Sequence, residues 1–129
     1  MKTSTLPNKL KLSEEAYTRL KMLKSKTGLE DWTLARLGLC FSLGDSSARD
    51  LSKYVQSNST KEFNRYTLTG DMDLLYGECV RSYVAKYSAG KLSEGDVMRA
   101  HLNRGIISLS RQVKSLADLS QLLSARASR

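Results

Sequence analysis

Polar and apolar residues at the start of the chain follow two different periods, which predict a short strand followed by two helices. Residues 9–12 (Lys-Leu-Lys-Leu) alternate with a period of two, as in a strand with both leucines on one face and both lysines on the other. Apolar residues then recur at helical spacing from 14 to 26 and from 34 to 43. Ser13 is a typical N-cap for the first helix, and Gly28 suits the left-handed residue that ends it.

Strand, helix, short glycine-containing turn and helix is the order of a ribbon-helix-helix unit. A single strand is not stable by itself, so in that architecture two chains pair their strands into a ribbon. This interpretation predicts an oligomer that is joined in part through residues 9–12. A helical hairpin with an extended lead-in accounts for the pattern nearly as well, and the sequence leaves both open.

The second half of the chain is predicted to hold two more helices, behind a polar loop at 44–61 and a compact mixed segment at 63–69. One helix runs from Met72 to about residue 89, and the last long helix begins at Ser93, a second typical N-cap. The last helix carries more apolar positions than one small core can cover, so we expect part of its stripe to face another subunit. That stripe consists of Met98, Leu102, Gly105, Leu109 and Leu116.

These elements predict a mainly α protein, a compact helical domain with a short N-terminal strand and a ribbon-helix-helix-like start, in an oligomeric assembly. The length of 129 residues is enough for one core and not for two. We therefore expect a single DNA-binding and assembly domain over residues 1–119. Residues 120–129 are rich in Ser, Ala and Arg and are expected to fray.

The charge of the chain favours a polyanionic partner. The formal net charge is +8 at pH 7. Residues 1–43 contribute +4 (eight basic against four acidic), and residues 93–129 contribute +3 (six against three). A basic excess of this kind serves either solubility or binding to a polyanion, and nucleic acid is the favoured partner.

Six cations of the first third of the chain are the candidate DNA-binding residues. The two strand lysines project from one strand face, and the other four border the first helix, where they can neutralise phosphates without reading sequence. A solvated polar surface remains the alternative for all six. The candidates are Lys9, Lys11, Arg19, Lys21, Lys24 and Lys26.

Two strings, Glu-Phe-Asn-Arg-Tyr-Thr-Leu at 62–68 and His-Leu-Asn-Arg-Gly at 101–105, each place an Asn-Arg pair among apolar residues. A guanidinium in such surroundings tends to be held by a carboxylate, a backbone carbonyl or a phosphate. Arg65 and Arg104 are therefore interpreted as structural or DNA-contacting. Asn64 and Asn103 are expected to cap or brace the local backbone, or to share that contact.

The residue types needed for catalysis do not come together in the sequence, so we predict a protein that is not an enzyme and holds no cofactor or metal. The glycines form no phosphate-binding loop, and a single histidine with two distant cysteines makes a poor ligand set. Cys40 and Cys79 are predicted to be free thiols on the apolar faces of helices. No signal peptide or membrane-spanning run is apparent, which favours a cytoplasmic protein.

Four segments in order give the chain a resemblance to the DndE family of DNA sulfur modification proteins. These are Leu-Pro-Asn-Lys-Leu-Lys-Leu-Ser-Glu-Glu at 6–15, Leu-Ala-Arg-Leu-Gly-Leu-Cys-Phe-Ser-Leu at 34–43, and the two Asn-Arg strings. The resemblance covers about residues 6–118. It implies a role in phosphorothioation, in which sulfur replaces a non-bridging oxygen of the DNA backbone.

The resemblance also implies partners. It points to a homo-oligomer, a tetramer, that binds duplex DNA with a preference for nicks, while companions such as DndC and DndD carry the chemistry. We consider two alternatives. One is a ribbon-helix-helix transcriptional regulator that reads bases through Lys9 and Lys11. The other is a scaffold that links the sulfur-transfer enzyme to the ATPase without touching DNA.

Overall fold

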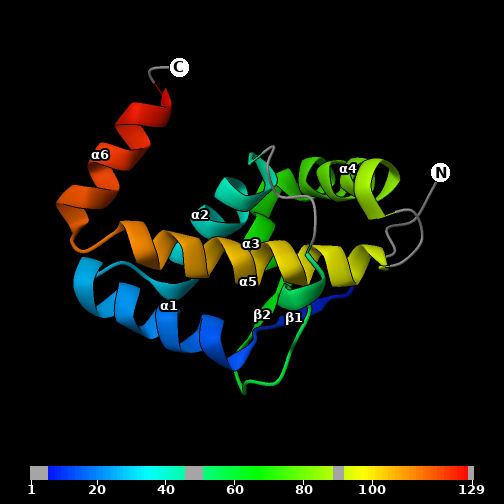
Figure 1. Cartoon of the computed structure of the whole chain (residues 1–129), viewed down its shortest axis with the longest axis horizontal. Coiled ribbons are helices and arrows are strands. Elements are labelled where there is room, and N and C mark those ends of the chain that lie inside the picture. The colour runs from blue at the N-terminus through cyan, green and yellow to red at the C-terminus, as the bar shows by residue number, and fades with distance from the viewer. Residues whose placement is uncertain (1–5, 46–50, 89–91, 128–129) are drawn as a thin grey trace.

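A computed structural model describes residues 6–45, 51–88 and 92–127 of the chain, which are mainly helical (Figure 1). Two short strands form a ribbon at one edge. The longest helix crosses the middle of the molecule, and the last helix leaves its end (Figure 1). The elements are β1 (Lys9–Lys11), α1 (Glu14–Thr27), α2 (Asp31–Leu43), the 3-10 turn η1 (Ser52–Tyr54), β2 (Glu62–Asn64), α3 (Arg65–Thr69), the 3-10 turn η2 (Gly70–Met72), α4 (Asp73–Tyr83), the π-helical turn η3 (Val84–Ser88), α5 (Glu94–Gln112) and α6 (Leu116–Ala127).

The predicted strand, helix and helix at the start of the chain are confirmed, with their predicted caps. The Ser13 hydroxyl accepts a hydrogen bond from the Ala16 backbone N–H at 3.1 Å, so it satisfies one of the free N–H groups of the first turn. Gly28 ends α1 with φ of 75°, in the left-handed region that a side chain would disfavour. The local sequence is therefore sufficient to set both ends of α1.

The partner of the first strand differs from the ribbon-helix-helix interpretation. β1 pairs with β2 of the same chain, antiparallel, with Leu10 opposite Phe63. β1 thus has a partner strand within its own chain and does not need a strand from a second chain. Residues 62–64, which the sequence marked only as a compact segment, supply the missing strand.

Helix α5 forms the centre of the fold. It begins with a capping box, in which Ser93 and Asp96 each bond the other's backbone N–H. It packs against α1, α2 and α4, and Met98, Leu102 and Leu109 are almost completely buried. The first four positions of its apolar stripe, from Met98 to Leu109, are thus covered by the chain itself, and the fifth, Leu116, is left exposed.

The last helix is shorter than predicted, because the chain turns at Val113. This residue has extended backbone (φ −112°, ψ 115°) and ends α5, and a separate helix α6 follows. Leu116, predicted to continue the buried stripe, lies in α6 and is 51% exposed. Residues 120–127, which we expected to fray, are helical, and 128–129 lie outside the described residues.

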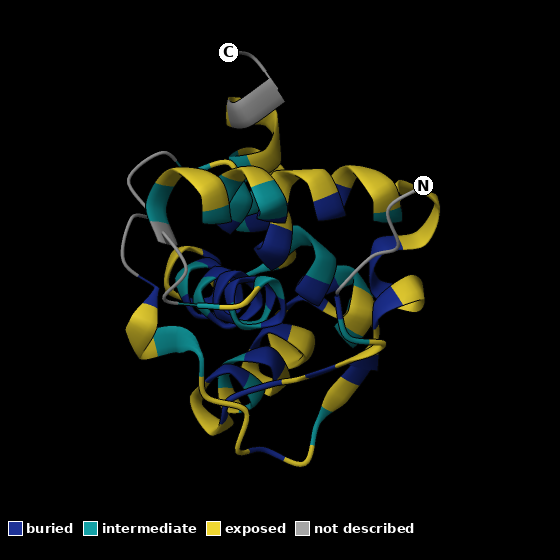
Figure 2. Cartoon of the chain, turned by 90° about the vertical axis from the view of Figure 1, so that its right-hand side faces the viewer, coloured by how far each residue is buried: buried dark blue, intermediate teal, exposed yellow. Residues whose placement is uncertain are grey.

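The apolar stripe of α4 is only partly buried. Tyr76 and Val80 are buried, whereas Leu75, and Met72 just before the helix, are more than half exposed. The expected stripe is wider than the surface that α2 and α5 can cover. Figure 2 shows buried residues gathered in the middle of the molecule and mostly exposed residues along the final helix.

Helices α2 and α5 approach each other so closely that two glycines face each other at their crossing. A Cβ atom on Gly105 would lie 1.8 Å from the Gly38 carbonyl oxygen, and one on Gly38 would lie 2.8 Å from the Ile106 backbone nitrogen. Both contacts are with backbone, which cannot move aside as a side chain can. The distance between the two central helices therefore requires glycine at both positions.

We expect Gly105→Ala to destabilise the protein by more than about 3 kcal/mol, since the new methyl group must push the two helices apart. Urea unfolding followed by circular dichroism measures the change. Gly77→Ala is the matched control in α4, because there a Cβ would meet only the mobile end of the Arg81 side chain. The control should keep or raise stability by up to about 1 kcal/mol; equal losses in both variants would contradict this account of the crossing.

Candidate nucleic-acid interface

The two strand lysines lie on the exposed face of the ribbon, as predicted. Leu10 between them is fully buried, while Lys9 and Lys11 are exposed. Glu62 is opposite Lys11 in the register, and its carboxylate lies 3.7 Å from Lys9 Nζ. Because this pair is solvent-exposed, the attraction is weak and both ammonium groups remain available to a stronger anion.

The four cations of α1 do not share one face. At about 100° per residue, Arg19 and Lys26 lie about 140–160° around the helix from Lys21. Lys24 is three residues from Lys21 and lies on the same side. The expected basic border is thus divided into two flanks, and the flank with Lys21 and Lys24 lines a groove together with Lys61.

That flank forms a shallow groove with the start of α2 and the segment before β2, which we call the α1 groove. Its volume is about 130 Å³, and it brings Lys61, which is 37 residues further along the chain than Lys24, next to the helix lysines. Lys21 Nζ lies 4.5 Å from the centre of the half-buried Tyr17 ring, a cation–π contact that positions the ammonium group. The groove is lined by Tyr17, Leu20, Lys21, Lys24, Asp31 and Lys61.

Lys61 was not among the predicted site residues, and no local pattern marks it. It reaches α1 only because β1 and β2 pair, which carries residue 61 back to the first helix. Its ammonium group forms an ion pair with Asp31. Partial burial acts to raise the pKa of Asp31, but the hydrogen bond and charge of Lys61 outweigh this effect and hold that pKa below its ordinary value. The groove therefore contains three cations and one ionised carboxylate.

Arg65 is enclosed by its own chain. It is 2% exposed, and its guanidinium donates to the backbone carbonyls of Leu6 and Pro7 and to the Asp73 carboxylate at 3.0 Å. Asn64 caps α3 by accepting hydrogen bonds from the two N–H groups of residues 66 and 67. Of the two interpretations that the sequence left for this pair, the geometry favours the structural one.

The second Asn-Arg pair has a similar environment. Asn103 accepts from the Ser13 backbone N–H at 3.0 Å and donates to the carbonyls of Tyr54 and Gln56, so it ties the start of α1 and the loop around η1 to α5. Arg104 donates to Ser42 Oγ at 3.1 Å and to the Asp45 carboxylate at 2.6 Å. Both residues brace the fold, and their polar atoms are directed at the protein.

His101 is completely buried between α2 and the end of α4. Its Nδ1 lies 2.8 Å from Ser42 Oγ, and its ring meets the Tyr83 ring edge to face at 4.6 Å between centroids. Ser42 Oγ therefore contacts both the imidazole and the Arg104 guanidinium, from which it accepts a hydrogen bond. Burial, and secondly the charge of Arg104, lower the pKa of His101 to about 4.

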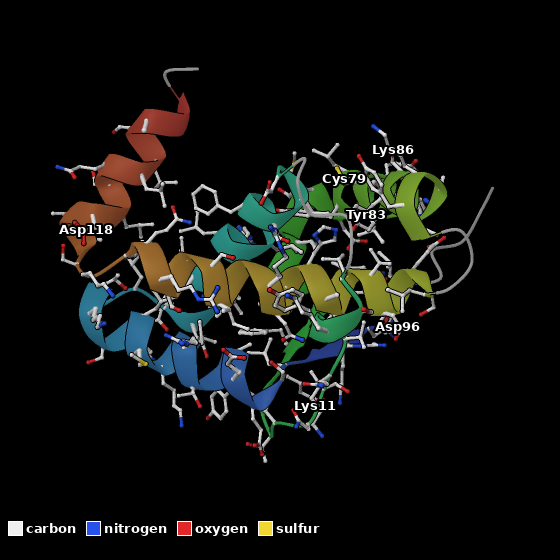
Figure 3. All side chains as sticks on the ribbon, in the orientation of Figure 1. Lys11, Cys79, Tyr83, Lys86, Asp96 and Asp118 are labelled. Atoms are coloured by element: carbon white, nitrogen blue, oxygen red, sulfur yellow. The ribbon has the colours of Figure 1, made fainter. Side chains whose placement is uncertain are left out.

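Both cysteines are free thiols on apolar helix faces, as predicted, but these faces are exposed and not covered by the rest of the chain. They line one apolar groove between the end of α2 and the start of α4, where Cys40 Sγ lies 2.8 Å from Tyr76 Oη. Burial and this contact raise the pKa of Tyr76. Figure 3 shows that Lys11 and Cys79 lie at opposite edges of the molecule, so the thiols are remote from the basic ribbon.

The described residues contain neither a cluster of metal ligands nor a helix that could cross a membrane. No three His, Cys, Asp or Glu side chains come together there as a metal would require. None of the described helices has both the length and the hydropathy needed to cross a bilayer. The α1 groove and the ribbon lysines form the basic surface of the described residues that suits a polyanionic partner.

The chain matches the family model described as "DNA sulphur modification protein DndE" over residues 9–117. Among solved structures it is similar to the crystal structure of DndE from Escherichia coli B7A, which is described as involved in DNA phosphorothioation modification. The match has a TM-score of 0.63 at 24% sequence identity and covers 81% of this chain and 99% of that chain. This likeness supports the fold. A comparison with curated proteins gave no match.

The buried imidazole predicts a loss of stability in mild acid. Since the pKa of His101 is about 4 in the folded state and about 6.5 in an unfolded chain, the unfolded state binds a proton first as the pH falls. The contribution of the neutral ring is complete above pH 6.5 and declines towards pH 4, by at most about 3 kcal/mol. Urea unfolding of the wild type and of His101→Gln at pH 7.5, 5.5 and 4.5 measures it. The free energy of unfolding of the variant should not show this decline with falling pH. Parallel pH profiles of the wild type and the variant would refute the assignment to His101.

Proposed function

The chain belongs to the DNA sulphur modification protein DndE family, and on that premise we propose that it is the non-catalytic, DNA-binding subunit of a DNA phosphorothioation complex. It grips the duplex backbone and acts in the cytoplasm with partner proteins such as DndC and DndD. The observation that carries this proposal is the α1 groove with the adjacent ribbon lysines.

The groove and the adjacent ribbon suit a phosphate backbone because they present cations from three separate segments. Lys21 and Lys24 belong to α1, Lys61 precedes β2, and Lys9 and Lys11 project from the ribbon that leads into α1. Lysine ammonium groups act as mobile point charges, which attract phosphates but do not discriminate among bases. Binding of this kind releases counterions and is strongly weakened by salt.

We also propose that the chain prefers nicked duplex DNA to intact duplex DNA. The ribbon cations and the helix cations lie on different elements, so a straight, stiff duplex contacts one set more easily than both. Bending intact DNA costs free energy, and a nick removes much of that cost. A nicked duplex can therefore follow both sets of lysines.

We assign the chemistry to the partner proteins. The single histidine is enclosed in the core, where its pKa of about 4 and its lack of exposure keep it from a substrate phosphate. We also propose a homotetramer, because several copies around one duplex would multiply a weak electrostatic contact into a useful affinity. The regulator alternative loses support, since β1 is paired within its own chain and no longer calls for a two-chain ribbon.

The proposal predicts salt-sensitive DNA binding that depends on one flank of α1. Lys21→Glu/Lys24→Glu should weaken binding at least tenfold at low salt and reduce the slope of log K against log salt by about 2. Fluorescence anisotropy with intact, nicked and single-stranded DNA of scrambled sequence, across a salt series, measures both quantities. The wild type should ignore sequence and bind the nicked duplex most tightly.

Arg19→Glu/Lys26→Glu is the matched control, because it makes the same charge change on the other flank of the same helix. It should reduce binding only by the general loss of positive charge. Equal effects of the two double variants would remove the α1 groove from the proposal. Absence of binding at low salt, with retained pull-down of the partner proteins, would leave the scaffold function instead.

A further inference from the structure

The edge of the molecule opposite the basic ribbon carries an open apolar groove, here called the α2/α4 groove. Its volume is about 370 Å³, and Leu75 and Met72 at its border are 54% and 51% exposed. The hydroxyl of Tyr76 is already paired with Cys40, so a ligand meets almost only apolar and thiol groups. The lining residues are Cys40, Leu43, Gly44, Met72, Leu75, Tyr76 and Cys79.

Helix α6 has an exposed apolar side that the chain itself does not cover. Leu119 and Leu122 pack towards the core, whereas Leu116 and Leu123 are 51% and 39% exposed. These two leucines are seven residues apart, so they share one side of the helix about 10 Å from each other. In Figure 1, α6 turns away from the end of α5.

The function of the family does not account for α6. The family match ends at residue 117, one residue after the start of this helix. The match to the E. coli chain covers 99% of that chain but 81% of this one, which is consistent with an added segment. Membership of the family therefore does not explain why this helix and its exposed leucines are present.

The charges around the groove complement the end of the chain. Exposed Asp71 lies next to Met72, and Glu78, whose side chain is 73% exposed, lies next to Cys79 and shares its charge with Arg81. Helix α6 has an acidic residue, Asp118, in its first turn, and the sequence after it contains two basic residues, at 126 and 129, and no acidic one. A leucine-bearing helix that leads into a basic end thus meets an apolar groove with carboxylates on its border.

We propose that α6 of a second copy of this chain docks in the α2/α4 groove, with its Leu116 and Leu123 side chains in contact with Leu75, Met72 and the two thiols. This is helix-in-groove recognition, in which leucines one heptad apart serve as anchors. Two chains can exchange their helices reciprocally, which covers both exposed apolar surfaces of each chain in one closed contact. The association requires no DNA. A failure of the chain to bind DNA would therefore not contradict it, and a failure of α6 to dock would not contradict DNA binding.

A disulfide that traps the docked helix tests the proposal, because the groove already carries exposed Cys79. The full-length Leu123→Cys variant, mixed as tagged and untagged chains without DNA, is oxidised with copper–phenanthroline. The expected product is a dimer on a non-reducing gel, with peptide mass spectrometry linking residue 123 of one chain to residue 79 or 40 of the other. Gln121→Cys, exposed on the other side of α6, is the matched control and should give at most a tenth of this product.

A second pair of variants tests the groove. In the Leu123→Cys background, Leu75→Asp should abolish the cross-link, whereas Leu74→Asp should keep it, because Leu74 is 80% exposed but is not a lining residue of the groove. Circular dichroism verifies that each variant is folded, and Met72→Asp replaces Leu75→Asp if the latter is not. A cross-link within one chain, equal cross-linking from position 121, or a cross-link that survives Leu75→Asp would each overturn the proposal.

Discussion

The contact between the backbones of Gly38 and Gly105 is the constraint on which the rest of the structure depends. It sets the spacing of α2 and α5 below what any side chain would allow, and α5 is the helix around which α1, α2 and α4 pack. At this spacing Ser42 can reach His101, and Arg104 can reach both Ser42 and Asp45. A wider separation would leave these buried polar groups without partners, at a cost of about 1–3 kcal/mol for each.

The two most distinctive strings of the sequence serve this packing. In residues 101–105, the His, Arg and Gly hold α5 against α2, and the Asn ties it to the start of α1 and the loop around η1. In residues 62–68, Arg65 fixes the segment before β1 and Asn64 caps α3. Buried polar networks of this kind specify one arrangement, because each donor needs its acceptor at a defined distance. The residue types that suggested a binding site are thus the ones that hold the surface elements in position.

The candidate DNA-binding lysines and the apolar groove are separated on the folded domain. The ribbon and α1 carry Lys9, Lys11, Lys21 and Lys24, and the α2/α4 groove opens at the edge opposite the ribbon, as the positions of Lys11 and Cys79 in Figure 3 make visible. Contact with a phosphate backbone at the first edge would leave the second free for another protein chain. The two proposals therefore concern surfaces that can be occupied at the same time.

The sequence by itself determined the main helices and several of their ends, because capping and periodicity act between residues close along the chain: Ser13, Gly28 and Ser93 stand where helix boundaries are. It also determined that Lys9 and Lys11 share a face, which follows from the pleat of a strand. Only the tertiary structure decided that β1 pairs within its chain, that Lys61 joins Lys21 and Lys24, and that Arg19 and Lys26 do not. The tertiary structure also decided that Arg65 is buried, that Cys40 is exposed and that α6 is separate from α5. Burial depends on which distant segments cover a surface, and no local sequence pattern contains that information.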